Sequence, residues 1–178
     1  MAVLITCFTL WTRFTAFCGA FLLFYCLSQP IDSANAADLQ AKFQDWSVFK
    51  SNRGDKVVCY AVSLPIRKED NFLHRGEPYL LVTNLANDSD EISVSSGFIY
   101  KQTSDIQMSF GSKKFYLFPY MAIAWASDNN DDLDIIKEMQ KSEEVTIVGT
   151  ARDNKISNDT YSLIGFAQAY AKLKEICK

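Results

Sequence analysis

Outside an apolar N-terminal segment, the residues best suited to covalent or metal chemistry are two cysteines, Cys59 and Cys177, and the only histidine, His74. A zinc site needs three or four nitrogen or sulfur ligands at short spacings, and these scattered residues do not supply it. A Cys59–His74 nucleophile pair would need a partly exposed, electropositive thiol, whereas Cys59 lies in the hydrophobic run 57–65. In an exported domain the two cysteines most simply form one disulfide; two unrelated buried thiols are the alternative.

Other catalytic and ligand-binding motifs do not match. The stretch 95–97 (Ser-Ser-Gly) is not the G-x-S-x-G turn of a serine nucleophile, and the seven glycines are scattered singly. The acidic run 128–134 lacks the spacing of a calcium-binding loop. Its aspartates instead suit the start of a helix, where negative charge is favourable. We therefore expect a protein that is not an enzyme and has no catalytic residue, cofactor or metal site.

A charged stretch, 66–77, is predicted to be a loop that could recognise a partner. Arg75 and Glu77 lie in it and Tyr79 follows it, and arginine and tyrosine are over-represented at binding hot spots. The alternative is an ordinary solvated loop. If these side chains bind a partner, Arg75→Ala should weaken binding without lowering the melting temperature.

An aromatic cluster follows later in the chain. It consists of Phe115, Tyr116, Phe118, Tyr120 and Trp125. A β-sandwich core uses such residues, so burial is the default expectation. Any of them left exposed would mark a partner site.

These residues must be positioned by a mainly β domain. Alternating apolar and polar residues predict strands over 43–49, 57–65, 78–83, 91–100, 106–110, 115–118, 145–150 and 159–166. Helices are expected over 131–141 and 167–177, and 121–126 fits either a strand or a helix start. About eight short strands with frequent turns indicate a sandwich or barrel.

The first 36 residues are predicted to be a secretory signal peptide. Arg13 is followed by the apolar run 14–27, and small residues precede a cleavage point after Ala36. An uncleaved anchor is the alternative, but this run is shorter than the roughly 20 residues that span a bilayer. Cleavage leaves one domain, 37–178, with no membrane span. The net charge of −3 argues against nucleic acid as the main partner.

A set of short motifs occurs in a fixed order along the domain. They are W-x-V (46–48), C-Y-A-V-S (59–63), R-G-E-P-Y (75–79), I-S-V-S-S-G (92–97), L-F (117–118), A-W-A (124–126), V-G-T (148–150) and D-T-Y-S-L-x-G-F (159–166), with a final Cys177. Together they resemble the invasion-associated locus B family. Many members carry an extra cysteine shortly after W-x-V, where this chain has Phe49-Lys50-Ser51. If Cys59 pairs with that extra cysteine in other members, its pairing with Cys177 would be the substitute in this chain.

The resemblance implies an exported alphaproteobacterial protein with an immunoglobulin-like β-sandwich, a role in host-cell entry and no enzymatic activity or cofactor. We expect a periplasmic or surface-associated protein that contributes to host-cell invasion through protein–protein recognition. Its partner would belong to the host-cell surface or the bacterial envelope. The alternative is a periplasmic housekeeping module that binds an envelope component or small ligand. An unpaired edge strand would also allow a homodimer.

Overall fold

The computed structural model describes residues 37–53, 56–85 and 89–177. The predicted signal peptide, 1–36, lies outside them, so its cleavage stays a prediction. The described elements are β1 (Asp38–Phe43), β2 (Trp46–Arg53), β3 (Lys56–Ser63), β4 (Arg67–Asp70), β5 (Tyr79–Leu85), β6 (Ser89–Ser95), β7 (Ile106–Phe110), β8 (Lys113–Tyr120), β9 (Ile123–Trp125), α2 (Asn129–Met139), β10 (Glu144–Thr150), β11 (Ile156–Ser162) and α3 (Phe166–Ile176).

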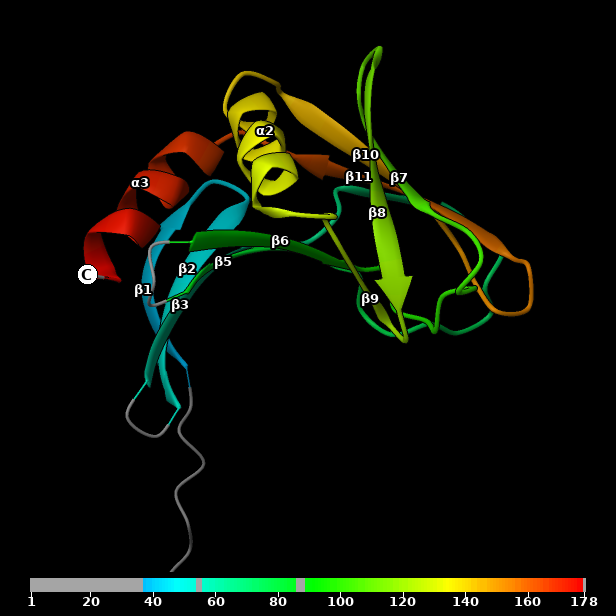
Figure 1. Cartoon of the computed structure of the whole chain (residues 1–178), viewed down its shortest axis with the longest axis horizontal. Helices are drawn as coiled ribbons and strands as arrows, with labels where there is room; N and C mark the ends of the chain where they lie inside the picture. Colours follow the sequence, from blue (N-terminus) through cyan, green and yellow to red (C-terminus); the bar gives the residue numbers. More distant parts are fainter. Residues whose placement is uncertain (1–36, 54–55, 86–88, 178) are drawn as a thin grey trace, which may run out of the picture. The chain divides into compact units, whose positions relative to one another are not determined.

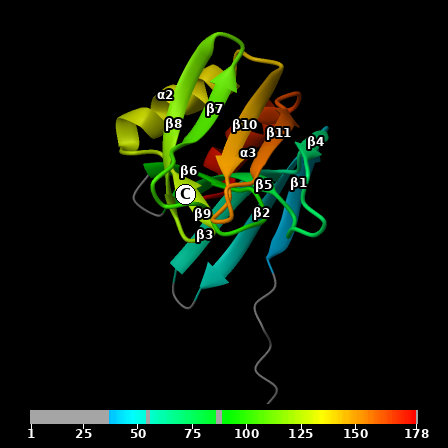
Figure 2. The ribbon, with the colours of Figure 1, turned by 90° about the vertical axis from the view of Figure 1, so that its right-hand side faces the viewer.

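The strands form two facing layers that share one strand, β8. The continuous order is β1-β2-β3-β5-β6-β9-β8-β7-β10-β11-β4, and the strand pairs are antiparallel. The first half of β8 pairs with β7, and its last three residues pair with β9. We call β1, β2, β3, β5, β6 and β9 layer A, and β7, β10, β11 and β4 layer B (Figures 1 and 2). The predicted mainly β, sandwich-like fold is confirmed.

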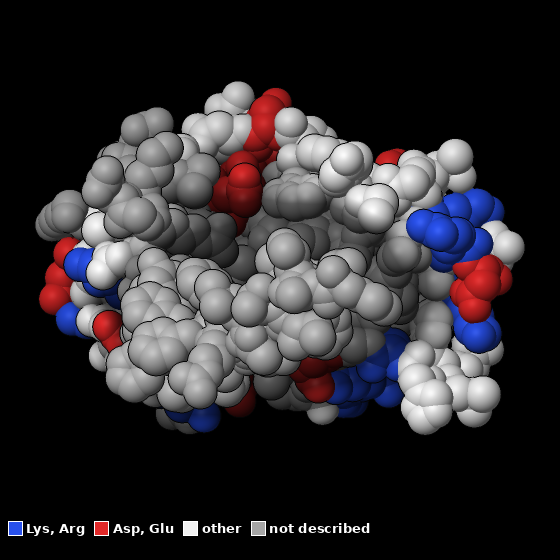
Figure 3. Space-filling view, turned by 90° about the horizontal axis from the view of Figure 1, so that it is seen from below, with Lys and Arg blue, Asp and Glu red and all other residues white. Residues whose placement is uncertain are grey.

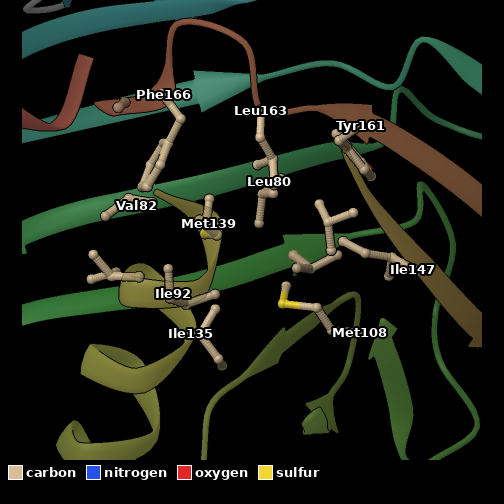
Figure 4. Close-up of a cluster of buried hydrophobic side chains, with 14 of the residues drawn as sticks. Leu80, Val82, Ile92, Met108, Ile135, Met139, Ile147, Tyr161, Leu163 and Phe166 are labelled. Atoms are coloured by element: carbon tan, nitrogen blue, oxygen red, sulfur yellow. The ribbon is translucent and has the colours of Figure 1, made fainter. Parts of the chain in front are cut away.

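The core lies between the inner faces of the two layers and is completed by the helices. Alternate residues of the strands point inward, and the largest side chains among them are almost fully buried. Figure 4 shows residues from both layers and both helices meeting in one cluster: Leu80, Val82, Ile92, Met108, Ile135, Met139, Ile147, Tyr161, Leu163 and Phe166.

The predicted disulfide is present and fastens the C-terminal helix to layer A. Cys59, on β3, is bonded to Cys177, which directly follows α3, and the two Cα atoms are 5.8 Å apart. Cys59 is fully buried. Its sulfur is therefore not available for a nucleophile pair with His74. A closed loop of this length is worth about 4–5 kcal/mol by chain-entropy estimates.

Three local expectations from the sequence were inaccurate, and one that had been left open is resolved. The predicted first strand is a hairpin, β1–β2, which turns at Gln44 with a φ of 52°. Part of the predicted loop 66–77 forms the edge strand β4, whose four residues are all charged. The segment 121–126, which the sequence allowed to be a strand or a helix start, contains strand β9. Helix α2 begins earlier than expected, because Asp128 accepts hydrogen bonds from the N–H groups of Asn130 and Asp131.

Within the three described ranges, no helix is long and apolar enough to cross a membrane.

Candidate interaction surfaces

Arg75, predicted to contact a partner, is instead bound inside the domain. Its guanidinium donates two hydrogen bonds to Asp159, at 2.8 and 2.6 Å, and one to the Ser96 carbonyl at 2.9 Å. It also forms an ion pair with Asp70 at 2.6 Å. Its side chain is 7 % exposed and that of Asp159 is 0 % exposed. The change Arg75→Ala would leave two carboxylates unpaired, so the structure predicts a lower melting temperature, unlike the expectation from the sequence.

The Arg75 cluster, which we define as Arg75, Asp70, Asp159, Ser96 and Tyr100, joins segments far apart in the sequence. The Tyr100 hydroxyl donates to the Ser96 hydroxyl at 2.9 Å, and burial raises the pKa of Tyr100 to about 12. The hydrogen bonds to Asp159 hold the pKa of Arg75 above its ordinary value. Charge-assisted, bidentate bonds of this kind fix geometry strongly. The cluster therefore anchors the loop before β5 onto β11 and the end of β6.

Neither of the other two predicted recognition residues forms a hydrogen bond or ion pair with Arg75 in the described part of the chain. Glu77 is an exposed residue that accepts a hydrogen bond from Lys68 Nζ at 2.7 Å. Tyr79 is the first residue of β5 and lies opposite Ser95. The loop presents Leu73 instead, which is 91 % exposed. The sequence signal for this exposed residue was the presence of an apolar side chain within a charged stretch.

The most exposed aromatic side chains lie on β8, in what we call the β8 row: Tyr116, Phe118 and Tyr120. They are 56 %, 47 % and 67 % exposed, respectively. They alternate with Leu117, which is 1 % exposed and points into the core. The β8 row therefore points outward as a consequence of the two-residue period of a strand. Figure 1 shows β8 running the length of its hairpin with β7, beside β9.

The β8 row continues onto the outer face of layer A. Phe118 lies opposite Trp125 on β9, with ring centroids 6.2 Å apart, and Tyr120 lies opposite Ile123. Trp125 in turn lies opposite Ser93 on β6. None of these residues is charged. Exposed apolar surface rich in tyrosine, tryptophan and phenylalanine is typical of protein-binding patches.

The exposed charged side chains, unlike the aromatic ones of the β8 row, do not gather by type. At the end of the domain that carries the β10–β11 turn, Figure 3 shows basic and acidic side chains next to one another rather than a patch of one sign. Across residues 37–53, 56–85 and 89–177, no group of three or more His, Cys, Asp or Glu side chains is placed to hold a metal ion.

Comparison with known proteins gives a likeness in fold but none in sequence. No protein-family model matches the sequence, and no curated protein matches it. Among solved structures, the fold is similar to the crystal structure of invasion associated protein B from Bartonella henselae. The TM-score is 0.57 at 15 % sequence identity, over 78 % of this chain and 97 % of that chain. At this identity the likeness shows a shared fold.

Proposed function

We propose that this protein is an exported, non-enzymatic protein of the cell envelope or cell surface that contributes to host-cell association or invasion by binding a partner protein. The observation that carries the proposal is the β8 row, three aromatic side chains held outward on a rigid strand. Aromatic residues form the centres of many protein interfaces because they bury a large area at a small cost in conformational entropy.

The fold likeness gives the proposal its biological direction. The neighbour of known structure is named as an invasion associated protein, and it is matched over nearly its whole length. Fold alone does not determine function. The assignment to host contact, and to the invasion-associated locus B family, therefore rests on this likeness together with the ordered motifs of the sequence.

A second candidate function is a periplasmic module that binds an envelope component or small ligand. The observation that favours it is a pocket of about 530 Å³ beside the anchored loop. Its volume lies within the range usual for small-molecule sites. In this case the protein would never reach the outer face of the cell.

Protease digestion of intact cells separates the two candidates. The protein is detected by antibody after digestion, and a known periplasmic protein in the same cells reports that the outer membrane is intact. The proposal predicts loss of this protein while the periplasmic control survives. Survival of both proteins would contradict the surface assignment and support the periplasmic candidate.

A further inference from the structure

The pocket beside the anchored loop is built by three segments from different parts of the chain. They are the loop before β5, the segment that follows β6, and the turn between β10 and β11. Its lining combines aromatic, aliphatic and charged side chains: Phe72, His74, Phe98, Ile99, Arg152 and Lys155, among others.

Backbone hydrogen bonds hold these three segments together. Gly76 N–H donates to the Gly97 carbonyl at 2.8 Å, and Arg152 N–H donates to the Ile99 carbonyl at 3.0 Å. Gly97 has a φ of 77°, and a Cβ atom there would overlap the Gly76 carbonyl. With Arg75 also bonded to Asp159, the pocket is formed before any ligand arrives. A preformed site avoids the cost of ordering loops on binding.

One wall of the pocket is aromatic. The rings of Phe72 and Phe98 are stacked, with centroids 4.8 Å apart and planes inclined by 16°. Tyr100 packs edge-on against Phe98 at 5.3 Å and supports it from the core side. Ile99 and Ala151 add aliphatic surface. A wall of this kind suits a planar apolar group, because offset or edge contacts between rings are favourable.

The rim of the pocket carries two cationic side chains, Arg152 and Lys155, beside one carboxylate, Asp153. Lys155 Nζ is 5.6 Å from the centre of the Phe72 ring and pairs with Asp153 at 3.0 Å. The other Asp153 oxygen accepts the Lys155 N–H group, so this carboxylate is already used within the turn. Arg152 is exposed and forms no ion pair within the described part of the chain. Its guanidinium is therefore free to bind a carboxylate.

We propose that this pocket binds an aromatic group that carries a nearby carboxylate. The ring would lie against the Phe72–Phe98 wall, and the carboxylate would accept hydrogen bonds from Arg152 and Lys155. The same chemistry occurs in a free aromatic acid and in a peptide segment with an aromatic residue beside an acidic one. The inference does not depend on the β8 row.

Three probes test the proposal by NMR titration of the purified, exported protein. They are N-acetylphenylalanine, its neutral amide, and a blocked peptide in which phenylalanine lies between two aspartates. We expect the amides of 72–74, 98–101 and 151–155 to shift. The acid should bind about tenfold more tightly than its amide, because only the acid forms charge-assisted hydrogen bonds with Arg152 and Lys155 at this open rim. Tighter binding of the blocked peptide identifies a protein segment as the natural source, and tighter binding of the free acid identifies a small molecule.

A matched pair of variants assigns the anion contact. Arg152→Gln/Lys155→Gln should weaken binding of the acid by about tenfold and leave its amide unchanged. Lys137→Gln is the control, because Lys137 is an exposed lysine paired with Asp134 on α2. It should change the binding of neither the acid nor its amide. Phe72→Ala should weaken the binding of both the acid and its amide. Equal affinity for acid and amide, shifts confined to other residues, or no shifts at about 10 mM of any probe would overturn the proposal.

Discussion

The Arg75 cluster and the β8 row reverse the usual placement of their residue types. A charged arginine is buried with two carboxylates, while three aromatic side chains of β8 lie in solvent. In the Arg75 cluster, each charge has a partner inside the domain. In the β8 row, Phe118 contacts the ring of Trp125, and within the described structure the three side chains form no hydrogen bond or ion pair. The charges of the Arg75 cluster are all paired within the domain. The β8 row, by contrast, would bury further apolar area if a partner covered it.

This comparison shows why burial and partners, rather than residue type, assign a role. Arginine and tyrosine are both frequent at interfaces, yet Arg75 is buried whereas Tyr116 and Tyr120 remain accessible. The two regions therefore predict opposite phenotypes. Substitutions in the Arg75 cluster should lower stability, and substitutions in the β8 row should lower binding.

The largest effect on stability is expected for Arg75→Ala. It leaves Asp159 and Asp70 facing each other without a counter-charge, so the free energy of unfolding should fall by about 3–5 kcal/mol. Arg67→Ala is the matched control, because Arg67 forms an exposed ion pair with Glu144 and should cost less than about 1 kcal/mol. Urea unfolding measures both. Equal stability of the two variants would refute a structural role for Arg75.

Removal of the disulfide should also lower stability, without affecting the Arg75 cluster or the β8 row. Cys59→Ala/Cys177→Ala releases α3 from β3, and the expected loss is about 2–5 kcal/mol. Neither cysteine contacts the β8 row in the described structure, so partner binding by the folded fraction should be unchanged. Unfolding curves and binding assays on the same preparation check this, and loss of binding by folded protein would link α3 to recognition.

Neighbouring residues of β8 should respond in opposite ways. Leu117→Ala opens a cavity in the core and should cost about 2–5 kcal/mol. Tyr120→Ser, three residues along the strand, changes a side chain that is 67 % exposed and should cost less than about 1 kcal/mol. Thermal and urea unfolding compare the two variants. A large loss of stability in Tyr120→Ser would mean that the β8 row is part of the fold rather than a free surface.

A further effect on stability is a pH dependence from Asp132, in the first turn of α2. Its side chain accepts the Ile92 N–H group at 2.7 Å, and burial raises its pKa from 3.8 to about 6. The folded state therefore binds a proton more readily than the unfolded state, so this residue adds most to stability at low pH. That contribution is lost as pH rises from 3.8 to about 6. Unfolding measured across this range should show a smaller pH dependence for Asp132→Asn; identical profiles would contradict the assignment.

Local patterns in the sequence predicted much of the fold. The hydrophobic run around Cys59 predicted β3, and the predicted turn at Gly111 separates β7 from β8. Strand β4 was missed because all of its residues are charged and only its position at the sheet edge makes it a strand. The role of Arg75 was missed because Asp159 lies 84 residues away, and no local pattern encodes that contact. Exposure of the β8 row also could not be predicted, because it depends on what the neighbouring layers leave uncovered.

The most direct test of the central claim measures stability and partner binding together in one variant, Tyr116→Ser/Phe118→Ser/Tyr120→Ser. The proposed binding of the purified protein to host cells should fall by about a hundredfold, while the free energy of unfolding should fall by less than about 2 kcal/mol. Arg67→Ala serves as the surface control. Unchanged binding by a folded triple variant would contradict the account.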